Sequence, residues 1–485
     1  MARHPHSPRP QIRTGGWNPP PTTASRRASR AQPVRFSDLA GRRVGVWGAG
    51  REGRAAHSAL REQDLAREVL IYTDESVPDE RRDAFGAGAR FEHGPDGFGA
   101  LEACEVVIRS PGVSRYRPEV ERLAASGVQL TTGTNLWFAE HGDERVVAVT
   151  GTKGKSTTAS LIAHLLNESG VRATLGGNVG RPLLDVLHVD PQPDVWVLEL
   201  SSFQAADLER GPSIGVLLNV HPEHLDWHGT PEQYMEDKVN LLRRNPDCLA
   251  VLNWSDERVR ELAGHLPDVR LFADIEGFHL DADGAISRSL DRLYEPDALR
   301  LQGRHNALNA CAALTVVQEL GLDAAALDEA LGSFEPLPHR LEPVGVYGGR
   351  TFVNDSIATT PPAAIAALEA LAGSRIAMIV GGYERGQDYA PLARRIVDSG
   401  VELVVGLPDT GKRIVAEVEG LEADQPPATR LAADLDEAVR VAADGIPAGG
   451  VVLLSPAAPS YVQFRDFEER GLAFAQAAAR VKEPA

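Results

Sequence analysis

The chain has 485 residues and a formal net charge of −18 at pH 7, with 43% hydrophobic and 24% charged residues. The composition is that of an ordinary globular protein, and the length suggests about three domains, each large enough to bury its own core. The negative charge argues against non-specific binding to nucleic acid, and no apolar run reaches the ~20 residues that a membrane span requires.

The first 35 residues differ from the rest, because they contain seven arginines, no acidic residue and many Pro, Ser and Thr. Such a segment cannot build a core, so we predict that residues 1–35 form a disordered basic tail. Its prolines oppose the amphipathic helix of a transit peptide, and it lacks the apolar segment of a secretory signal. The three cysteines are widely spaced and form no metal motif, and a cytoplasmic location fits them best.

Residues 36–133 show the alternation of strands and helices that predicts a Rossmann-like domain. The first strand, at residues 42–48, leads into a G-x-G-x-x-G loop from Gly48 to Gly53, and a second strand ends near Asp74. This spacing places an anion at a helix N-terminus, and a following acid is typical of a dinucleotide site. Because the motif fits other nucleotides as well, a nicotinamide oxidoreductase is only one reading of it.

The most specific motif is a phosphate-binding loop. A strand-like run at residues 146–149 leads into a helical pattern through Gly151, Thr152, Lys153, Gly154, Lys155, Ser156 and Thr157. In such a loop backbone N–H groups face the phosphates, the lysine reaches the β- and γ-phosphates, and a hydroxyl can bind Mg²⁺. Only five of the 50 basic residues are lysine, so Lys153 and Lys155 indicate that a compact point charge is needed here.

The loop opens a second domain in which two more buried strands end in polar residues. Glu199 ends the strand within residues 194–202, and His224 and Asp226 end the strand segment at residues 213–229. Parallel sheets place their ligands at these strand ends, and Mg²⁺ needs only one or two carboxylates beside a phosphate loop. We therefore expect Glu199 to bind Mg²⁺, Asp226 to be a candidate for a similar role, and His224 to be a ligand or a proton carrier.

Other polar residues are less specific. Lys238 lies on a predicted helix, Asn306 and Asn309 share one helix face, and the polar loops at residues 354–361 and 455–467 follow C-terminal strands. Each could equally be a surface or capping residue. The predicted fold class is α/β with three domains: a Rossmann-like domain at residues 36–133, a P-loop ATPase-like domain with a parallel sheet at 134–336, and a second Rossmann-like domain at 337–485.

Taken together and in this order, the motifs resemble the Mur ligases, ATP-dependent amide-forming enzymes of peptidoglycan precursor synthesis. The motifs are TGTKGKSTT, LELSSFQ, NVHPEHLDWHG, GRHNALNACAAL, LPHR, VNDS and LLSPAAPSYVQFRDFEERG. The second and the last resemble the members that add glutamate to UDP-N-acetylmuramoyl-L-alanine. The resemblance covers nearly all of the chain from about Val34 onward, and it implies ATP and Mg²⁺ as cofactors and a monomeric enzyme.

The resemblance also implies roles for individual residues. ATP would contact Gly151, Thr152, Lys153, Gly154, Lys155, Ser156, Thr157, Asn309, Arg340 and Asp355. Mg²⁺ would be bound by Ser156, Glu199, His224 and a carbamylated Lys238. The UDP-linked substrate would contact Gly48, Gly50, Gly53, Asp74, Asn178, Ser201 and Gln204. Glutamate would contact Arg385, Ser460, Tyr461 and Phe467.

In the implied reaction, ATP converts the alanyl carboxylate into an acyl phosphate, which the amine of glutamate attacks. Charge develops on the transferred phosphoryl group, so Lys155 and Mg²⁺ would supply most of the stabilisation, and His224 and Lys238 complete the catalytic set. A folate-type polyglutamate ligase would share the ATP motifs but not the first domain. An oxidoreductase leaves the phosphate loop unexplained, and a non-catalytic nucleotide-binding regulator would not need the complete catalytic set.

Three positions depart from the pattern of the D-glutamate-adding members. Ile357 and Arg385 stand where lysines are expected, and Tyr461 replaces a leucine beside Ser460. All of them belong to the third domain, where the amino-acid acceptor is expected to bind, and an arginine fork is not equivalent to an ammonium group. We therefore favour the branch that adds L-glutamate and works with a separate epimerase, with D-glutamate addition as the alternative.

Overall fold

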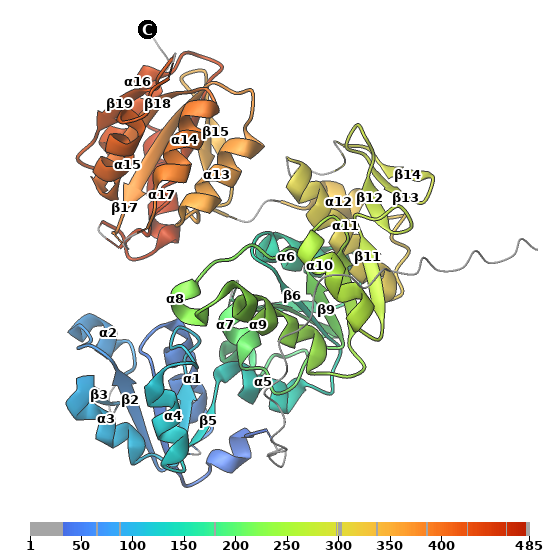
Figure 1. Ribbon diagram of the computed structural model, residues 1–485, viewed down its shortest axis with the longest axis vertical. Coiled ribbons are helices and arrows are strands. Elements are labelled where there is room, and N and C mark those ends of the chain that lie inside the picture. The colour runs from blue at the N-terminus through green and yellow to red at the C-terminus, as the bar shows by residue number, and fades with distance from the viewer. Residues whose placement is uncertain are drawn as a thin grey trace, which may run out of the picture. The chain divides into compact units, whose positions relative to one another are not determined.

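Figure 1 shows the computed structural model of the chain, in which helices flank successive β-sheets. The structure describes residues 33–64, 66–86, 89–178, 181–296, 298, 303–335, 338–384, 387–423, 425–461 and 463–481. Contacts divide the chain into two compact units, one of residues 1–299 and 305–334, the other of residues 300–304 and 335–485. The predicted basic tail, residues 1–35, lies almost entirely outside the described residues.

The first unit begins with a five-stranded parallel sheet in the order β3-β2-β1-β4-β5. Its strands are β1 (Arg43–Trp47), β2 (Glu68–Thr73), β3 (Arg90–His93), β4 (Val106–Arg109) and β5 (Gln129–Thr131). Its helices are η1 (Phe36–Leu39), α1 (Arg51–Glu62), α2 (Asp79–Asp83), α3 (Gly94–Glu102), α4 (Pro118–Ala125) and α5 (Gly133–His141). The strand order reverses between β1 and β4, which is where doubly wound sheets bind ligands.

The second sheet of this unit has six parallel strands in the order β11-β10-β9-β6-β8-β7. Its strands are β6 (Val146–Thr150), β7 (Ala173–Gly177), β8 (Val195–Glu199), β9 (Ile214–Leu217), β10 (Leu249–Asn253) and β11 (Val269–Phe272). β6, β8 and β9 are buried at every position, as expected for strands covered on both faces. The phosphate loop follows β6, which lies inside the sheet between β9 and β8.

Several helices and a small extra sheet accompany the second sheet. The helices are α6 (Lys155–Glu168), η2 (Leu183–Val186), α7 (Ser202–Ala206), α8 (Leu225–His228), α9 (Pro231–Arg243), α10 (Glu257–Leu262), η3 (Ala263–His265), α11 (Arg304–Glu319) and α12 (Asp328–Ser333). The extra sheet is antiparallel and consists of β12 (Phe278–Leu280), β13 (Ile286–Arg288) and β14 (Asp291–Tyr294). The sequence pattern did not predict it, because strands this short contain too few residues to show an alternation.

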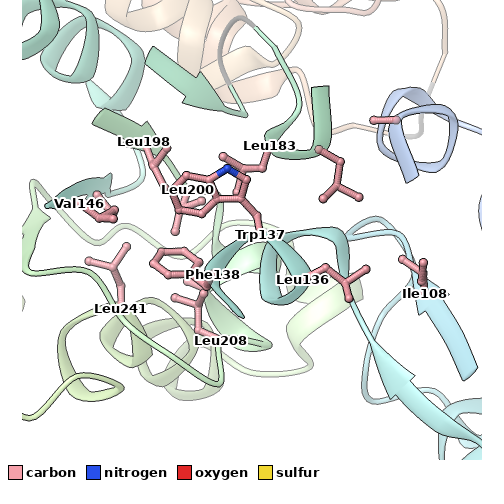
Figure 2. Packing of buried hydrophobic residues seen from close by; sticks show 14 of the residues in the cluster. Ile108, Leu136, Trp137, Phe138, Val146, Leu183, Leu198, Leu200, Leu208 and Leu241 are labelled. Atoms are coloured by element: carbon pink, nitrogen blue, oxygen red, sulfur yellow. The ribbon is translucent and has the colours of Figure 1, made fainter. Parts of the chain in front are cut away.

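One hydrophobic core joins the two sheets of the first unit. It includes Ile108 of β4 as well as Val146 of β6 and Leu198 of β8, all almost fully buried. Figure 2 shows α5 inside this core, with Leu136 toward Ile108 and Trp137 near Leu198. The two sheets therefore share buried apolar surface and belong to one unit, although the sequence predicts a domain boundary after residue 133. The predicted bounds of the three domains remain a prediction.

The second unit contains a six-stranded sheet in the order β15-β16-β20-β17-β18-β19, with only β15 antiparallel to its neighbour. Its strands are β15 (Glu342–Tyr347), β16 (Arg350–Asn354), β17 (Ile376–Gly382), β18 (Val401–Asp409), β19 (Ala428–Leu431) and β20 (Val451–Leu454). Its helices are α13 (Pro361–Ala370), α14 (Ala390–Asp398), α15 (Thr410–Glu419), α16 (Leu435–Gly445) and α17 (Phe467–Ala478). Separate apolar clusters cover the two faces of this sheet.

The predicted α/β class is confirmed, because all three large sheets are parallel or almost entirely parallel and alternate with helices along the chain. One detail of the prediction is wrong. The strand expected within residues 213–229 ends at Leu217, so His224 and Asp226 lie beyond a loop, at the start of the short helix α8. Pro222 lacks the backbone N–H that a continuing strand would need. In the described part of the chain, no helix is long and apolar enough to cross a membrane.

Candidate functional site

The phosphate loop after β6 is held by a side chain from the neighbouring strand segment. Asn219 Oδ1 accepts hydrogen bonds from the backbone N–H groups of Thr152 (3.1 Å) and Lys153 (2.8 Å). Asn219 Nδ2 donates to the carbonyl oxygen of Lys153 at 3.0 Å, and the Thr152 hydroxyl lies 2.9 Å from the Tyr234 hydroxyl. These bonds hold the backbone of the loop in place. The sequence reasoning missed Asn219, whose only signal is a polar residue following a buried strand.

A left-handed glycine brings the loop against the helix that carries Asn309. Gly154 is the N-cap of α6 and has a φ of 85°, a conformation that favours glycine. A Cβ atom at this position would lie 2.4 Å from Asn309 Oδ1, so a side chain would collide with the amide. Asn309 is buried and donates through Nδ2 to Asn306 Oδ1 at 3.3 Å. The structure thus places the predicted base-binding amide directly beside the phosphate loop.

Two lysines converge on one carbonyl oxygen of the loop. Lys155 Nζ donates to the carbonyl oxygens of Gly151 and Thr152 at 3.1 and 3.0 Å, and Lys238 Nζ donates to that of Gly151 at 2.8 Å. Lys238 is fully buried in α9, and its Nζ lies 4.6 Å from the centroid of the Tyr234 ring. Burial, together with the charge of Lys155, lowers the pKa of Lys238 well below the usual value of a lysine. The amino group is therefore more readily neutral than a surface amine.

Glu199 lies at the end of β8 and is almost completely buried. Its Oε1 accepts a hydrogen bond from Asn178 Nδ2 at 2.7 Å, whereas Oε2 has no hydrogen-bond partner in the described structure. A buried carboxylate oxygen without a donor is costly, and a cation would satisfy it. Glu199 also interacts electrostatically with Lys238, which places the two predicted metal ligands in one neighbourhood.

His224 occupies a strained position at the start of α8. Its φ of 56° lies in the left-handed region, which for a residue other than glycine costs on the order of 1 kcal/mol. Its ring packs edge-on against Phe203 with centroids 4.9 Å apart, and burial lowers the pKa of the imidazole. Lys238 acts on His224 electrostatically, so both belong to the same site. Asp226, the alternative candidate, is exposed, as His224 is.

Glu223 is a further acidic group that the sequence reasoning did not single out. Its Oε1 lies 2.9 Å from Lys153 Nζ, and its charge also acts on Lys238 and His224. No group of three or more His, Cys, Asp or Glu side chains clusters as a metal site among the described residues. A cation near Glu199 would therefore need ligands of other kinds, such as hydroxyl or phosphate oxygens or a modified lysine.

The glycine loop of the first sheet is sterically constrained. A Cβ atom on Gly53 would lie 2.0 Å from the carbonyl oxygen of Gly48, and one on Gly48 would lie 2.6 Å from the Ser110 hydroxyl. The structure imposes no such constraint at Gly50. In the first turn of α1, burial raises the pKa of Glu52 to about 7, and sequence reasoning had given this residue no role.

The other residues predicted to bind the UDP-linked substrate are engaged with the protein itself. Asp74 forms an ion pair with Arg117, with Oδ2 2.7 Å from Nη1. Ser201 and Gln204 form a capping box at the N-terminus of α7, in which Gln204 N donates to Ser201 Oγ at 3.2 Å and Ser201 N donates to Gln204 Oε1 at 3.0 Å. Asn178 is exposed and contacts Glu199 as described above.

In the second unit, Asp355 follows β16 and is buried. Its Oδ2 accepts a hydrogen bond from Ser455 Oγ at 2.8 Å, and its Oδ1 accepts one from the backbone N–H of Leu341 at 3.2 Å. Burial raises the pKa of Asp355 to about 7, while the Ser455 hydrogen bond and the charge of Arg340 act in the opposite direction. The predicted pair Arg340 and Asp355 is thus electrostatically coupled in the structure.

Three of the four predicted acceptor residues, Ser460, Tyr461 and Phe467, lie on the loop after β20 and at the start of α17. Ser460 is buried, and Tyr461 is 56% exposed, with its ring packed edge-on against that of Tyr383. Ser460 lines a small pocket together with Gly382 and the buried Arg470. Phe467 is the first residue of α17, and its carbonyl oxygen accepts the Ser356 hydroxyl at 2.7 Å. Ile357 is half-buried, whereas Arg385 lies outside the described residues.

Comparisons with known proteins agree over almost the whole chain. Residues 149–317 match the Mur ligase middle domain, and residues 339–458 match the Mur ligase, glutamate ligase domain. A UDP-N-acetylmuramoyl-L-alanine--L-glutamate ligase from Micromonospora sp. is 45% identical, covering 92% of this chain and 98% of the relative. A ligase of the same name from Xanthomonas campestris pv. campestris is 41% identical, covering 92% and 97%.

Solved structures give the same fold. A UDP-N-acetylmuramate-alanine ligase from Thermotoga maritima has a TM-score of 0.58 at 20% identity, covering 90% of this chain and 98% of that one. A MurF ligase from Thermotoga maritima in complex with ADP has a TM-score of 0.56 at 18% identity, covering 93% and 99%. At such low identity these likenesses establish the fold alone.

Proposed function

The chain belongs to the Mur ligase family, and we propose that it joins L-glutamate to UDP-N-acetylmuramoyl-L-alanine, at the expense of ATP, in peptidoglycan precursor synthesis. The observation that carries this proposal is the similarity to curated ligases of that name, which are 41% and 45% identical and cover 92% of this chain. The geometry of the phosphate loop and of the buried charges around it supports the ATP-dependent half of the reaction.

ATP would bind at the loop between β6 and α6. The N-terminus of α6 presents backbone N–H groups to an anion, and Lys155 adds a positive charge. Asn309 lies beside Gly154, where it would contact the adenine base. ATP would transfer its γ-phosphoryl group to the alanyl carboxylate, with ADP as the leaving group. The glutamate amine would then attack the acyl phosphate, forming the amide and releasing phosphate and a proton. Arg340 and Asp355 remain predicted ATP contacts, as the family resemblance implies.

The residues around Glu199 fit Mg²⁺. The buried oxygen of Glu199 that has no hydrogen-bond partner in the described structure is the kind of hard ligand this ion prefers. We propose that Ser156, Glu199, His224 and a carbamylated Lys238 hold it. When bound, the ion neutralises charge on the transferred phosphoryl group. Lys155, from the phosphate loop, would stabilise the same charge.

The UDP-linked substrate would bind at the carboxyl end of β1, where the strand order of the first sheet reverses. The tight glycine turn lets the diphosphate approach the N-terminus of α1. The proposed contacts are Gly48, Gly50, Gly53, Asp74, Asn178, Ser201 and Gln204. The hydrogen bond from Asn178 to Glu199 supports this placement, because it links the muramoyl-alanine side of the site to the predicted metal ligand.

Glutamate would bind at the loops of the third sheet, through Arg385, Ser460, Tyr461 and Phe467. Ile357 stands where the D-glutamate-adding members carry the ammonium group of a lysine, so that charge is missing here. Tyr461 places an exposed ring beside Ser460. An altered set of charges around the acceptor is consistent with a substrate of opposite configuration. The L-product would then pass to an epimerase that inverts its terminal residue.

A direct assay tests the proposal. The purified protein is incubated with UDP-N-acetylmuramoyl-L-alanine, ATP and Mg²⁺, and phosphate release is measured with each glutamate enantiomer. We expect kcat/KM to be at least about 10-fold higher for L-glutamate, and faster turnover of D-glutamate would overturn the choice of enantiomer. The Lys155→Ala variant should lose about 100-fold or more in kcat with its circular dichroism unchanged, because it lacks the charge that faces the phosphates.

Two competing functions give different outcomes in simple binding assays. A nicotinamide oxidoreductase would bind NAD(H) at the first sheet, and a folate-type polyglutamate ligase would not bind a UDP-sugar. We expect the protein to bind the UDP-sugar and not NAD(H).

We also propose that it works as a monomer in the cytoplasm, where ATP and UDP-linked precursors are available, and sedimentation analysis tests the oligomeric state.

A further inference from the structure

The three proposed protein ligands of Mg²⁺ other than Ser156 come from three separate segments. Glu199 ends β8 and is followed by α7, His224 precedes α8, and Lys238 lies within α9. Segments of this kind can shift independently unless a common contact holds them in register. The side chain of His228 provides such a contact, although neither the motifs nor the proposed reaction assigns it a role.

The imidazole of His228 bridges α7 and α9. Its Nδ1 lies 2.6 Å from Asp237 Oδ2 and its Nε2 lies 3.0 Å from Ser202 Oγ. Asp237 immediately precedes Lys238 in α9, and Ser202 is the first residue of α7. Each ring nitrogen of His228 therefore bonds to a residue that is close in sequence to one proposed ligand.

The other hydrogen bonds of Asp237 show which nitrogen of the His228 ring donates and which accepts. Its Oδ1 accepts from the Tyr116 hydroxyl at 2.6 Å and from Gln233 Nε2 at 3.0 Å. An ionised carboxylate only accepts, so His228 Nδ1 donates to its second oxygen, and in the neutral ring Nε2 accepts from the Ser202 hydroxyl. Both oxygens of this buried carboxylate are then satisfied, and removal of the ring would leave one of them without a donor.

His228 also fixes the third ligand through α8. Its backbone N–H donates to the carbonyl oxygen of His224 at 3.0 Å, which closes the single turn between the two histidines. The Phe203 ring packs against both, with centroids 4.9 Å from His224 and 5.5 Å from His228. The left-handed backbone conformation of His224 is strained and persists only where neighbouring contacts hold it. The turn anchored by His228 provides such contacts.

Ser202, His228 and Asp237 have the connectivity of a hydrolytic triad, but burial excludes that role. The side chains of His228 and Asp237 are 0% and 3% exposed, and Ser202 is 4% exposed. No substrate can reach the hydroxyl, so the chain of hydrogen bonds acts on the protein itself.

We propose that His228 is a positioning residue for the metal site: its ring, bonded to Ser202 and Asp237, holds the segments of Glu199, His224 and Lys238 in the arrangement that binds a divalent cation with ATP. The inference rests on the proposed function, since it concerns the ligands proposed for that reaction. Contacts outside the ligand set commonly change metal affinity by about 10- to 100-fold when removed.

Two substitutions test the two hydrogen bonds of the His228 ring separately. The amide of His228→Asn can replace the Nδ1 donor to Asp237, and that of His228→Gln can replace the group facing Ser202. Mn²⁺ binding in the presence of a non-hydrolysable ATP analogue is measured by electron paramagnetic resonance, and the Mg²⁺ concentration for half-maximal activity is measured separately. We expect both variants to bind Mn²⁺ about 10-fold or more weakly, with the KM for glutamate unchanged.

His141 provides a matched control. Its Nδ1 lies 3.1 Å from Glu144 Oε1 and its Nε2 lies 2.9 Å from the carbonyl oxygen of Leu187, so it also bridges two segments, away from the proposed ligands. We expect His141→Asn to lower thermal stability without changing Mn²⁺ affinity. Ser202→Ala, which removes only a hydroxyl, should weaken Mn²⁺ binding by a few-fold and tests the idea if the His228 variants do not fold.

The outcomes distinguish this inference from the proposed function. Wild-type Mn²⁺ affinity in the folded His228 or Ser202 variants, or an equal loss in His141→Asn, overturns the positioning role even if the wild type makes the L-glutamate product. Weakened Mn²⁺ binding in the His228 variants upholds it, even if the wild-type protein fails to join glutamate to the UDP-linked substrate.

Discussion

A single buried amino group has the clearest chemical consequence in this molecule. Lys238 is enclosed in α9, donates to Gly151 of the phosphate loop, and has a lowered pKa because of burial. Only a neutral amine attacks carbon dioxide, so burial favours the carbamate that the family resemblance implies. Carbamylation would replace the amino group of Lys238 with an anionic group whose oxygens can bind Mg²⁺.

Removal of carbon dioxide tests the carbamate. We expect exhaustive degassing of the protein to lower kcat by about 10-fold or more, and added bicarbonate to restore it. A carbamate signal should be visible after exchange with ¹³C-labelled bicarbonate and absent in Lys238→Met. Lys412→Met serves as the control, because Lys412 is an exposed lysine of α15. A labelled signal that survives in Lys238→Met would assign the carbamate to another residue.

Residues in contiguous motifs could be predicted, and those that act across the fold could not. Lys155 and Glu199 stand in short patterns whose chemistry is local, and their roles toward a phosphate and a cation remain predictions. Asn219 and His228 reach partners that are 66 and 26 residues away in the sequence. A single polar residue after a buried strand, or a histidine in a short helix, carries no signal of such partners.

At the scale of elements, the ends of β16 and β20 enclose a carboxyl group. Asp355 accepts hydrogen bonds from Ser455 and from the backbone of Leu341, yet its burial raises its pKa from 3.8 to about 7. The folded chain therefore binds this proton more tightly than the unfolded chain. The resulting stability is fully present below about pH 4 and is lost as the pH rises to about 7.

Asp355→Asn should remove this pH dependence. The full loss in wild type is at most about 4 kcal/mol, at 1.36 kcal/mol for each pH unit between the two pKa values. We expect the free energy of urea unfolding of the second unit, followed separately from that of the first, to change less between pH 5 and pH 8 in the variant and to equal or exceed that of wild type at pH 8. Asp436→Asn is the control, because the Asp436 side chain is 66% exposed. Parallel pH profiles for wild type and Asp355→Asn would show that Asp355 ionises normally.

Element prediction followed the strength of the local pattern. β6, β8 and β17 are continuous apolar runs, and α6 follows its loop directly, so each was predicted at the observed place. The segment between Leu217 and His224 was wrongly predicted as strand, because it continues from the apolar run of β9, while the turn depends on Asn219 and on contacts with Phe203. Local periodicity does not report contacts of this kind.

At the scale of the whole molecule, each compact unit has its own hydrophobic core. Leu198 belongs to the cluster that joins the first two sheets, and Leu453 belongs to a cluster of the third sheet; both are fully buried. Units with separate cores can unfold separately, so a single unfolding free energy does not describe the chain.

Scanning calorimetry of the full chain should therefore show two unfolding transitions. We expect Leu198→Ala to lower one and Leu453→Ala the other, each by about 2–5 kcal/mol, because a buried leucine loses its packing and leaves a cavity. The double variant should show both changes added. A single transition that both substitutions lower equally would mean that the two units unfold as one.

The order of motifs along the chain by itself determined the α/β class, the phosphate loop and the family, because each depends on residues that are close in sequence. The tertiary structure decided which side chains meet: Asn219 under the loop, Asn178 against Glu199, and His228 between α7 and α9. It also joined the first two sheets through one core around α5. These contacts depend on distances between segments remote in sequence, which burial and hydrogen bonding set only once the chain has folded.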